Sequence, residues 1–117
     1  MQKDGIKACR FNPYKPVLSV IMNDRDHRKI LVVDGKIAHT GGYNIADEYI
    51  NEVERFGYWK DAGIRVTGEC VNSFTTMFLE MWSYINRTGE VENKYLVKKN
   101  TNTDAKGFVM PFCVLCW

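Results

Sequence analysis

The sequence lacks any long apolar stretch and any framework of paired cysteines. No run approaches the ~20 apolar residues of a membrane span, and no basic segment followed by an apolar one marks a secretory signal. Without such a signal four cysteines do not make a disulfide scaffold, so we expect Cys9 and Cys70 to be buried thiols. The spacing of Cys113 and Cys116 gives only half of a zinc site. We therefore expect a soluble or peripheral chain that uses no metal and no cofactor.

Histidine is scarce, and the charge is nearly balanced. The chain of 117 residues has two histidines, and its 16 basic and 14 acidic side chains leave a net charge of +2. Residues 1–36 carry eight Lys or Arg against four acidic residues, whereas residues 37–92 are acidic. A modest basic excess is usually only a solvated face, although it also suits an anionic ligand. With 45% hydrophobic residues, the chain can form the core of one globular domain.

The first histidine opens a pattern that carries chemistry. His27, Lys29, Asp34, Gly42 and Asn44 fit the string H-x-K-x4-D-x6-G-G-x-N. Residues two apart on a strand project from the same face, so His27 and Lys29 would place a nucleophile beside a cation that binds phosphate. Each residue alone is more often structural, as a hydrogen-bonded histidine, a turn or a helix cap. Only their joint order favours a site.

The motif is expected to lie on a β-hairpin. The apolar run 30–33 predicts a strand buried within a sheet rather than at its rim, and Asp34-Gly35 predicts a two-residue turn. The resulting register places Leu31 opposite Ala38 and Lys29 opposite Thr40. The sequence therefore predicts which side chains share a face of the hairpin.

In this register His27 faces Gly42, and the glycine leaves room for a substrate phosphate. Asn44 would cap a helix over residues 45–55, whose N-terminal N–H groups attract an anion. His39 lies on the opposite face of its strand, so we expect it to be structural or exposed, without a role in chemistry.

The remaining elements complete an α/β fold, a mixed sheet flanked by helices. We expect a strand at 6–11, a strand at 59–66, a helix at 69–86, a polar linker at 87–107 and a buried strand at 108–117. The apolar face of the long helix comprises Val71, Phe74, Phe78, Met81, Trp82 and Ile85. In the strand at 59–66, Asp61 and Arg65 face one side, and Ala62, Ile64 and Val66 face the other.

The motif resembles the HKD motif of the phospholipase D superfamily, and its surroundings resemble bacterial cardiolipin synthases. The similar segments are RFNPYKP, DHRKILVVDGKIAHTGG, NIADEYI, GYWKDAGIRVTG and the helix ending FLEMW, with weaker likeness in NRTGE and GFVMP. The main resemblance runs from Gly5 to Trp82. It implies a phospholipase D-like half domain over residues 1–86, incomplete at both ends, with residues 108–117 opening a missing second half.

The resemblance also implies a role for each motif residue. His27 would attack phosphorus and form a covalent phosphohistidine, while Lys29, Asn44 and Gly42 would hold the substrate phosphate. Asp61 would bind the other ring nitrogen of the histidine and fix its tautomer. Asp34, at the hairpin turn, would support the backbone rather than touch substrate.

One requirement of this chemistry is missing from the sequence. The superfamily takes a second histidine from a second HKD motif to protonate the leaving oxygen, and no second H-x-K occurs in this chain. A second half in cis, or a second copy of the chain, would have to supply it. The expected reaction joins two phosphatidylglycerol molecules into cardiolipin and glycerol. In the full-length protein, preceding segments would hold it at the cytoplasmic face of the bacterial membrane.

Two alternatives remain open from the sequence. A homodimeric phosphodiesterase or nuclease would use water as acceptor with two copies of His27, although nucleic acid is not the expected partner. An inactive remnant would keep the fold pattern and bind phosphate or a partner without turnover. The solution mass of the chain and its reaction product distinguish these possibilities.

Overall fold

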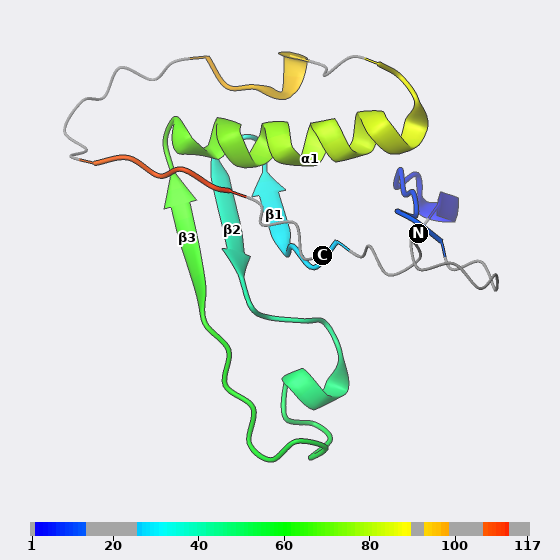
Figure 1. Ribbon diagram of the computed structural model, residues 1–117, viewed down its shortest axis with the longest axis vertical. Coiled ribbons are helices and arrows are strands. Elements are labelled where there is room, and N and C mark those ends of the chain that lie inside the picture. The colour runs from blue at the N-terminus through cyan, green and yellow to red at the C-terminus, as the bar shows by residue number, and fades with distance from the viewer. Residues whose placement is uncertain (1, 14–25, 90–92, 99–106, 113–117) are drawn as a thin grey trace.

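The computed structural model describes residues 2–13, 26–89, 93–98 and 107–112, and their fold is α/β. Strands β1 (Ile30–Val33), β2 (Ile37–Gly41) and β3 (Gly63–Thr67) form one sheet in the order β1-β2-β3, and α1 (Cys70–Asn86) runs across it (Figure 1). Both strand pairs are antiparallel. The α/β class is confirmed. The expected mixed sheet flanked by helices is, in the described part of the chain, an antiparallel sheet with a single α-helix.

The hairpin forms as expected, but its register is shifted by one residue. Asp34 and Gly35 have φ of +51° and +65°, and the Lys36 N–H donates to the Val33 carbonyl over 2.9 Å. These are the positive φ values that an Asp-Gly hairpin turn requires. Pairing then begins with Val33 opposite Ile37, so that Lys36 is an extra residue on the second strand.

The shift exchanges the faces of the hairpin. Ala38 pairs with Val32, not with Leu31, and is completely buried. The observed register packs apolar side chains around Ala38 beneath α1; the expected one would have put Lys29 on that face. The gain in buried apolar area explains why the predicted register was wrong.

Strand β1 lies at an edge of the described sheet. Its burial alternates, with Ile30 and Val32 half-buried towards the core and Leu31 and Val33 exposed on the other face. The expectation of a strand buried on both faces inside the sheet was therefore wrong. Leu31 and Val33 leave an apolar surface on the side of the sheet away from α1.

The core is small and lies between α1 and the sheet. Ala38, Val71 and Phe74 are buried together, and Ile30, Val32 and Val66 pack against them. The helix matches the predicted one closely, but its buried face does not. Its buried residues are Val71, Phe74, Thr75, Leu79 and Ser83. Phe78 is 51% exposed and stacks on Trp82 with a centroid distance of 6.0 Å, so the apolar stripe is rotated relative to the predicted one.

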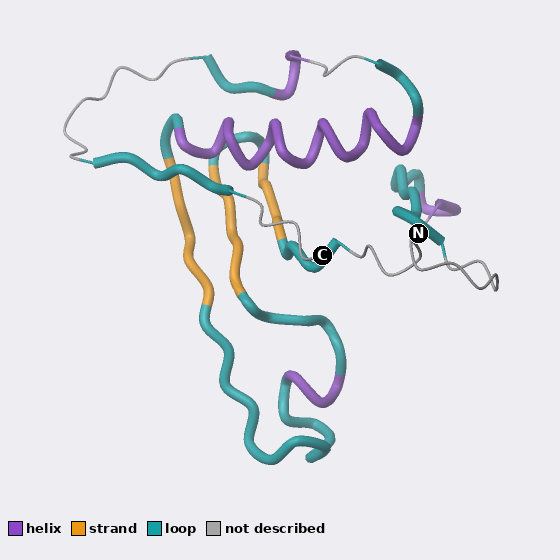
Figure 2. The backbone as a smooth tube through the Cα atoms, in the orientation of Figure 1, coloured by secondary structure: helices purple, strands orange, loops and turns teal. Residues whose placement is uncertain are grey.

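Between β2 and β3 the chain makes a long excursion away from α1 (Figure 2), which we call the arm (residues 42–62). The predicted helix over 45–55 is absent, and the arm contains only the 3₁₀ turn η3 (Asp47–Tyr49). The rest of the arm is loop. Strand β3 begins at Gly63, later than the expected start at residue 59, although Ile64 and Val66 do share a face opposite to Arg65.

Both ends of the described chain differ from expectation. Residues 6–11 form no strand, and the described residues 108–112 form none either, with Phe108 90% exposed. Residues 113–117, and with them the Cys113 and Cys116 pair, lie outside the described residues. Cys9 is exposed and Cys70 is half-buried, so neither is the buried thiol we expected. No helix among the described residues is long and apolar enough to cross a membrane.

A short segment after α1 is fastened back onto the helix. It contains the 3₁₀ turn η4 (Asn93–Tyr95), and beyond it the Asn72 side chain pairs with the Val97 backbone, donating to its carbonyl over 2.9 Å and accepting from its N–H over 3.0 Å. Val97 in turn packs against the hairpin turn. A Cβ added at Gly35 would lie 2.8 Å from the Val97 side chain, so glycine is required there by space as well as by its positive φ.

The difference between two neighbouring phenylalanines of α1 tests this description of the core. Phe74 is 3% exposed and Phe78 is 51% exposed. We expect Phe74→Ala to lower the free energy of unfolding by about 3–5 kcal/mol, because it removes a buried ring and leaves a cavity. The matched Phe78→Ala should cost much less. Denaturant titration followed by circular dichroism measures both, and equal losses would contradict the observed helix face.

Candidate active site

The pairing of β2 with β3 brings together two candidate residues that are far apart in sequence. The strands end at Gly41 opposite Gly63, and the Gly42 N–H donates to the Ala62 carbonyl over 3.1 Å just beyond them. Asp61 comes directly before Ala62 on that neighbouring segment. A Cβ built on Gly42 would lie 2.6 Å from Asp61 Oδ1. Any side chain at position 42 would therefore displace the carboxylate.

An aromatic ring that the sequence analysis did not identify covers the same strand ends. A Cβ on Gly41 would lie 2.7 Å from Tyr43 Cε1, and one on Gly63 would overlap the same ring edge. The two glycines thus leave the space that the Tyr43 ring occupies. An aromatic ring commonly covers the gap that glycines leave in a sheet. The glycines at the strand ends and the nearby Tyr43 were therefore the feature of the sequence from which this contact could have been predicted.

His27 and Lys29 lie just before β1, not within it. His27 is exposed, Lys29 is half-buried, and Lys29 Nζ donates to the His27 backbone carbonyl over 2.7 Å. Because Ile30 pairs with Thr40, both residues precede the end of the sheet at which Gly42 also lies. The hydrogen bond keeps the ammonium group close to the backbone of the histidine, and an arriving phosphate would compete for its protons.

The residues flanking His27 form an ion pair that the sequence analysis did not single out. Arg28 Nε and Nη2 donate to the two Asp26 carboxylate oxygens over 2.8 and 2.9 Å. The hydrogen bonds from Arg28 hold the pKa of Asp26 below its ordinary value of 3.8. Since Asp26 and Arg28 bracket His27, this pair restrains the backbone that presents the imidazole. The acidic and basic residues on either side of the histidine were the feature of the sequence from which this ion pair could have been predicted.

Asp61 has a hydrogen-bond partner on its own segment. Its Oδ2 accepts from the Trp59 indole N–H over 2.7 Å. Within the described residues the carboxylate is exposed and makes no hydrogen bond to His27. Its proposed role in orienting the imidazole therefore stays a prediction.

Two other motif residues, Asp34 and Asn44, make no contact within the described part of the chain that tests their expected roles. Asp34 is at the hairpin turn, at the opposite end of β2 from Gly41, and its supporting role stays a prediction. Asn44 is half-buried and caps no helix: η3 begins after Ala46, which makes no side-chain cap. The expected helix N-terminus is thus absent, and phosphate binding by Asn44 stays a prediction.

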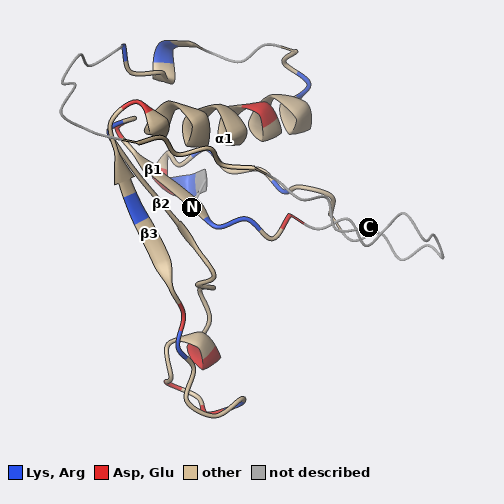
Figure 3. Ribbon diagram, turned by 60° about the vertical axis from the view of Figure 1, so that its left-hand side comes forward, with Lys and Arg blue, Asp and Glu red and all other residues tan. Residues whose placement is uncertain are grey.

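The distribution of charge follows these elements. Figure 3 marks Lys and Arg residues on the segment leading into β1, acidic residues on η3, and residues of both signs on the segment leading into β3. His39 lies within the sheet, half-buried, between Leu31 and Arg65 and away from the helix face. An imidazole, an ammonium group and a carboxylate thus lie near one end of the sheet, and groups of these kinds can act in displacement at phosphorus.

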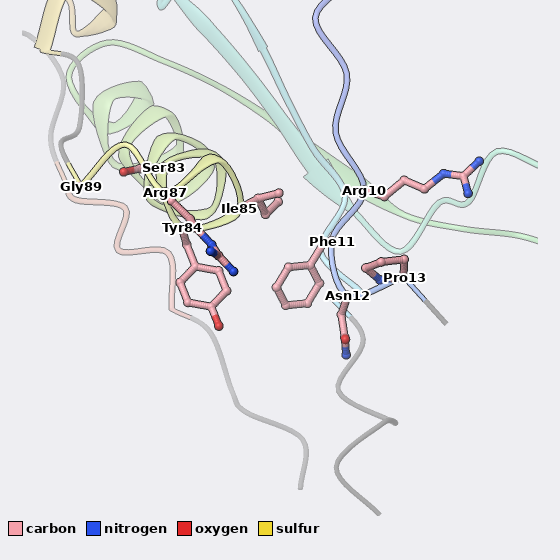
Figure 4. Close-up of a pocket in the computed structure, with 9 residues that line it drawn as sticks. All are labelled: Arg10, Phe11, Asn12, Pro13, Ser83, Tyr84, Ile85, Arg87 and Gly89. Carbon is pink, nitrogen blue, oxygen red and sulfur yellow. The ribbon is translucent and has the colours of Figure 1, made fainter. Parts of the chain in front are cut away.

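A groove in the described structure lies away from the motif residues. It has a volume of about 810 Å³ and is lined by residues 10–13 together with the C-terminal end of α1 and the residues that follow it (Figure 4). Phe11 and Tyr84 lie on opposite sides of the groove, while the Arg10 side chain points away from it. None of its lining residues belongs to the motif, so the groove is not part of the candidate site.

Comparison with known proteins gives close relatives but no fold match. The chain is 52% identical over 112 residues to an uncharacterised protein of Streptococcus mutans, covering 96% of this chain and 24% of that protein. No family model matches, and no solved structure matches.

Other relatives carry a functional name. The chain is 42% identical over 82 residues to cardiolipin synthase 2 of Staphylococcus epidermidis, covering 70% of the chain and 17% of that protein. It is 43% identical over 92 residues to a cardiolipin synthase of Staphylococcus aureus, covering 71% and 19%. The chain thus spans about a quarter or less of the curated relatives it matches. Over most of its length, this chain is similar to one segment of proteins named cardiolipin synthase.

Proposed function

We propose that this chain carries one half of the active site of a cardiolipin synthase-like phosphatidyltransferase. The observation that carries the proposal is the similarity to proteins named cardiolipin synthase over about 70% of the chain. The HKD motif of the sequence supplies the reacting groups, and the pairing of β2 with β3 supplies the proximity of Gly42 to Asp61. The proposed substrate is an anionic phospholipid, phosphatidylglycerol.

In the first step a ring nitrogen of His27 attacks the phosphorus of phosphatidylglycerol. A bond forms between nitrogen and phosphorus, the bond to the glycerol oxygen breaks, and glycerol leaves with a proton from a second histidine. In the second step a hydroxyl group of another phosphatidylglycerol gives its proton back to that histidine and attacks phosphorus. The nitrogen–phosphorus bond then breaks, releasing cardiolipin and free His27.

The other motif residues would stabilise charge and orientation. Lys29 carries the positive charge that compensates the phosphate oxygens in the transition state. Gly42 leaves the space that the Asp61 carboxylate occupies beside the strand end. Asn44 would add a hydrogen bond to a phosphate oxygen. Asp61 would accept a hydrogen bond from the other nitrogen of His27 and fix its tautomer, while Asp34 maintains the hairpin turn.

The second histidine must come from another segment, since the chain has one H-x-K. In a full-length synthase it would come from a second HKD half in cis, and for this chain alone from a second copy that donates its own His27. The membrane would be reached through other segments of the full-length protein, at its cytoplasmic face. The acceptor distinguishes this function from hydrolysis, because attack by water would give phosphatidic acid in place of cardiolipin.

The two histidines of the chain provide the first test. We expect His27→Ala to abolish release of glycerol from phosphatidylglycerol vesicles, because the nucleophile is lost, and His39→Ala to keep most of the rate. If two copies pair, the rate should rise more steeply than in proportion to chain concentration at low concentration. Glycerol release and lipid products measure both effects. Equal activity of wild type and His27→Ala would contradict the mechanism, and phosphatidic acid as sole product would favour the hydrolase.

The orienting carboxylate provides the second test. We expect Asp61→Asn to lower the His27-dependent rate by about a hundredfold or more, because the imidazole loses its tautomeric control, while the circular dichroism spectrum stays native. The control is Asp47→Asn, an exposed carboxylate in the same arm. If Asp61→Asn unfolds the chain and leaves the activity of the folded fraction unchanged, Asp61 is a structural residue.

A further inference from the structure

The indole of Trp59 is held at the base of the arm in a way that simple packing does not require. We propose that Trp59 is a positioning residue for the reaction: its N–H fixes the Asp61 carboxylate in the orientation that the candidate site needs. This inference rests on the proposed function, since the orientation of Asp61 matters for catalysis only if the carboxylate serves His27.

The two oxygens of Asp61 have different surroundings. Oδ2 accepts from Trp59 Nε1 over 2.7 Å, which is a short, charge-assisted hydrogen bond. Oδ1 lies beside Gly42, within 2.6 Å of where a Cβ would stand. With one oxygen bound to the indole, the carboxylate cannot rotate freely, and the other oxygen is directed to the strand end next to the motif glycines. The indole thus determines which oxygen faces the site.

The backbone of Trp59 is fixed by a second residue of the arm. Asn51 Oδ1 accepts from the Trp59 N–H over 2.6 Å, and Asn51 Nδ2 donates to the Trp59 carbonyl over 2.9 Å. Asn51 itself has φ of +63°, a left-handed conformation that asparagine tolerates better than most residues. The Asn51 side-chain amide therefore bonds both backbone groups of Trp59, as the backbone of a neighbouring strand would. This contact joins two segments of the arm.

The ring of Trp59 is fixed by two further aromatic side chains. Tyr49 meets it edge to face with a centroid distance of 5.0 Å and an interplanar angle of 78°, and Phe56 packs at 5.9 Å. Edge-to-face and offset contacts at these distances are favourable and directional. With backbone and ring both restrained, the indole N–H has a defined direction, and Asp61 lies along it.

A spectroscopic test separates positioning from general packing. The chain has three tryptophans, so its indole N–H groups give three proton–nitrogen correlation signals, and Trp59→Phe identifies the one from Trp59. We expect Asp61→Asn to shift the Trp59 indole signal and to speed its exchange with solvent, because the charged acceptor is lost. The signal of Trp82, in α1, should not move. An unchanged Trp59 signal in Asp61→Asn would overturn the inference.

A kinetic test connects the contact to the reaction. We expect Trp59→Phe, which keeps an aromatic ring but removes the donor, to lower the His27-dependent rate of glycerol release roughly tenfold or more, the scale of one charged hydrogen bond. KM should change little. The control Trp82→Phe should keep the wild-type rate. In an Asp61→Asn background, Trp59→Phe should add little further loss, because the two residues act through one interaction.

The outcomes distinguish the two claims. If a sample in which two copies of the chain associate shows no His27-dependent release of glycerol, the proposed function fails and the positioning role fails with it, whatever the indole signals show. If wild type is active and Trp59→Phe keeps the full rate, the inference is wrong while the proposed function stands. If Trp59→Phe lowers the rate equally in the wild-type and Asp61→Asn backgrounds, Trp59 acts independently of Asp61, and the inference is again wrong.

Discussion

The antiparallel pairing of β2 with β3 is the constraint on which the candidate site depends. It places Gly41 opposite Gly63 and Gly42 beside Asp61, although most of the arm lies between the partners in sequence. A slip of one residue would turn every side chain of β3 to the other face and move the carboxylate away. Ala38 pairs with Val66 beneath α1. A slip of one residue would expose this small core, so the core resists it. Packing under the helix therefore fixes the position of the Asp61 carboxylate at the Gly41 end of the sheet.

Elements with strong local signals were predictable from the sequence, and elements held by distant contacts were not. The 3.6-residue periodicity gave the long helix almost to its ends, and Asp34-Gly35 gave the hairpin turn. The predicted register was wrong because Lys36 is an extra residue between the turn and the paired part of β2. No local sequence rule requires that residue. The choice between registers was made by the burial of Ala38 against α1, and that contact is visible only in the folded chain.

The arm shows the same limit at the candidate site. Residues 45–55 begin with features of a helix start, but Asn51 has a left-handed backbone and its side chain pairs with Trp59. Two hydrogen bonds and three packed aromatic rings thus replace the helix expected from sequence. The motif identified His27 and Lys29 as candidates, and the family resemblance added Asp61. Neither gave any indication that the carboxylate would be bound by the indole two residues before it.

The central claim is that His27 forms a covalent bond to phosphorus, and the most direct measurement is mass spectrometry of the chain quenched under alkaline conditions during turnover of phosphatidylglycerol. We expect the peptide that contains His27 to carry a phosphatidyl group, or the glycerophosphoryl group that remains when base removes its acyl chains, through a nitrogen–phosphorus bond that is stable to base and broken by acid. Turnover without any adduct at His27, or an adduct at His39 in its place, would contradict the central claim.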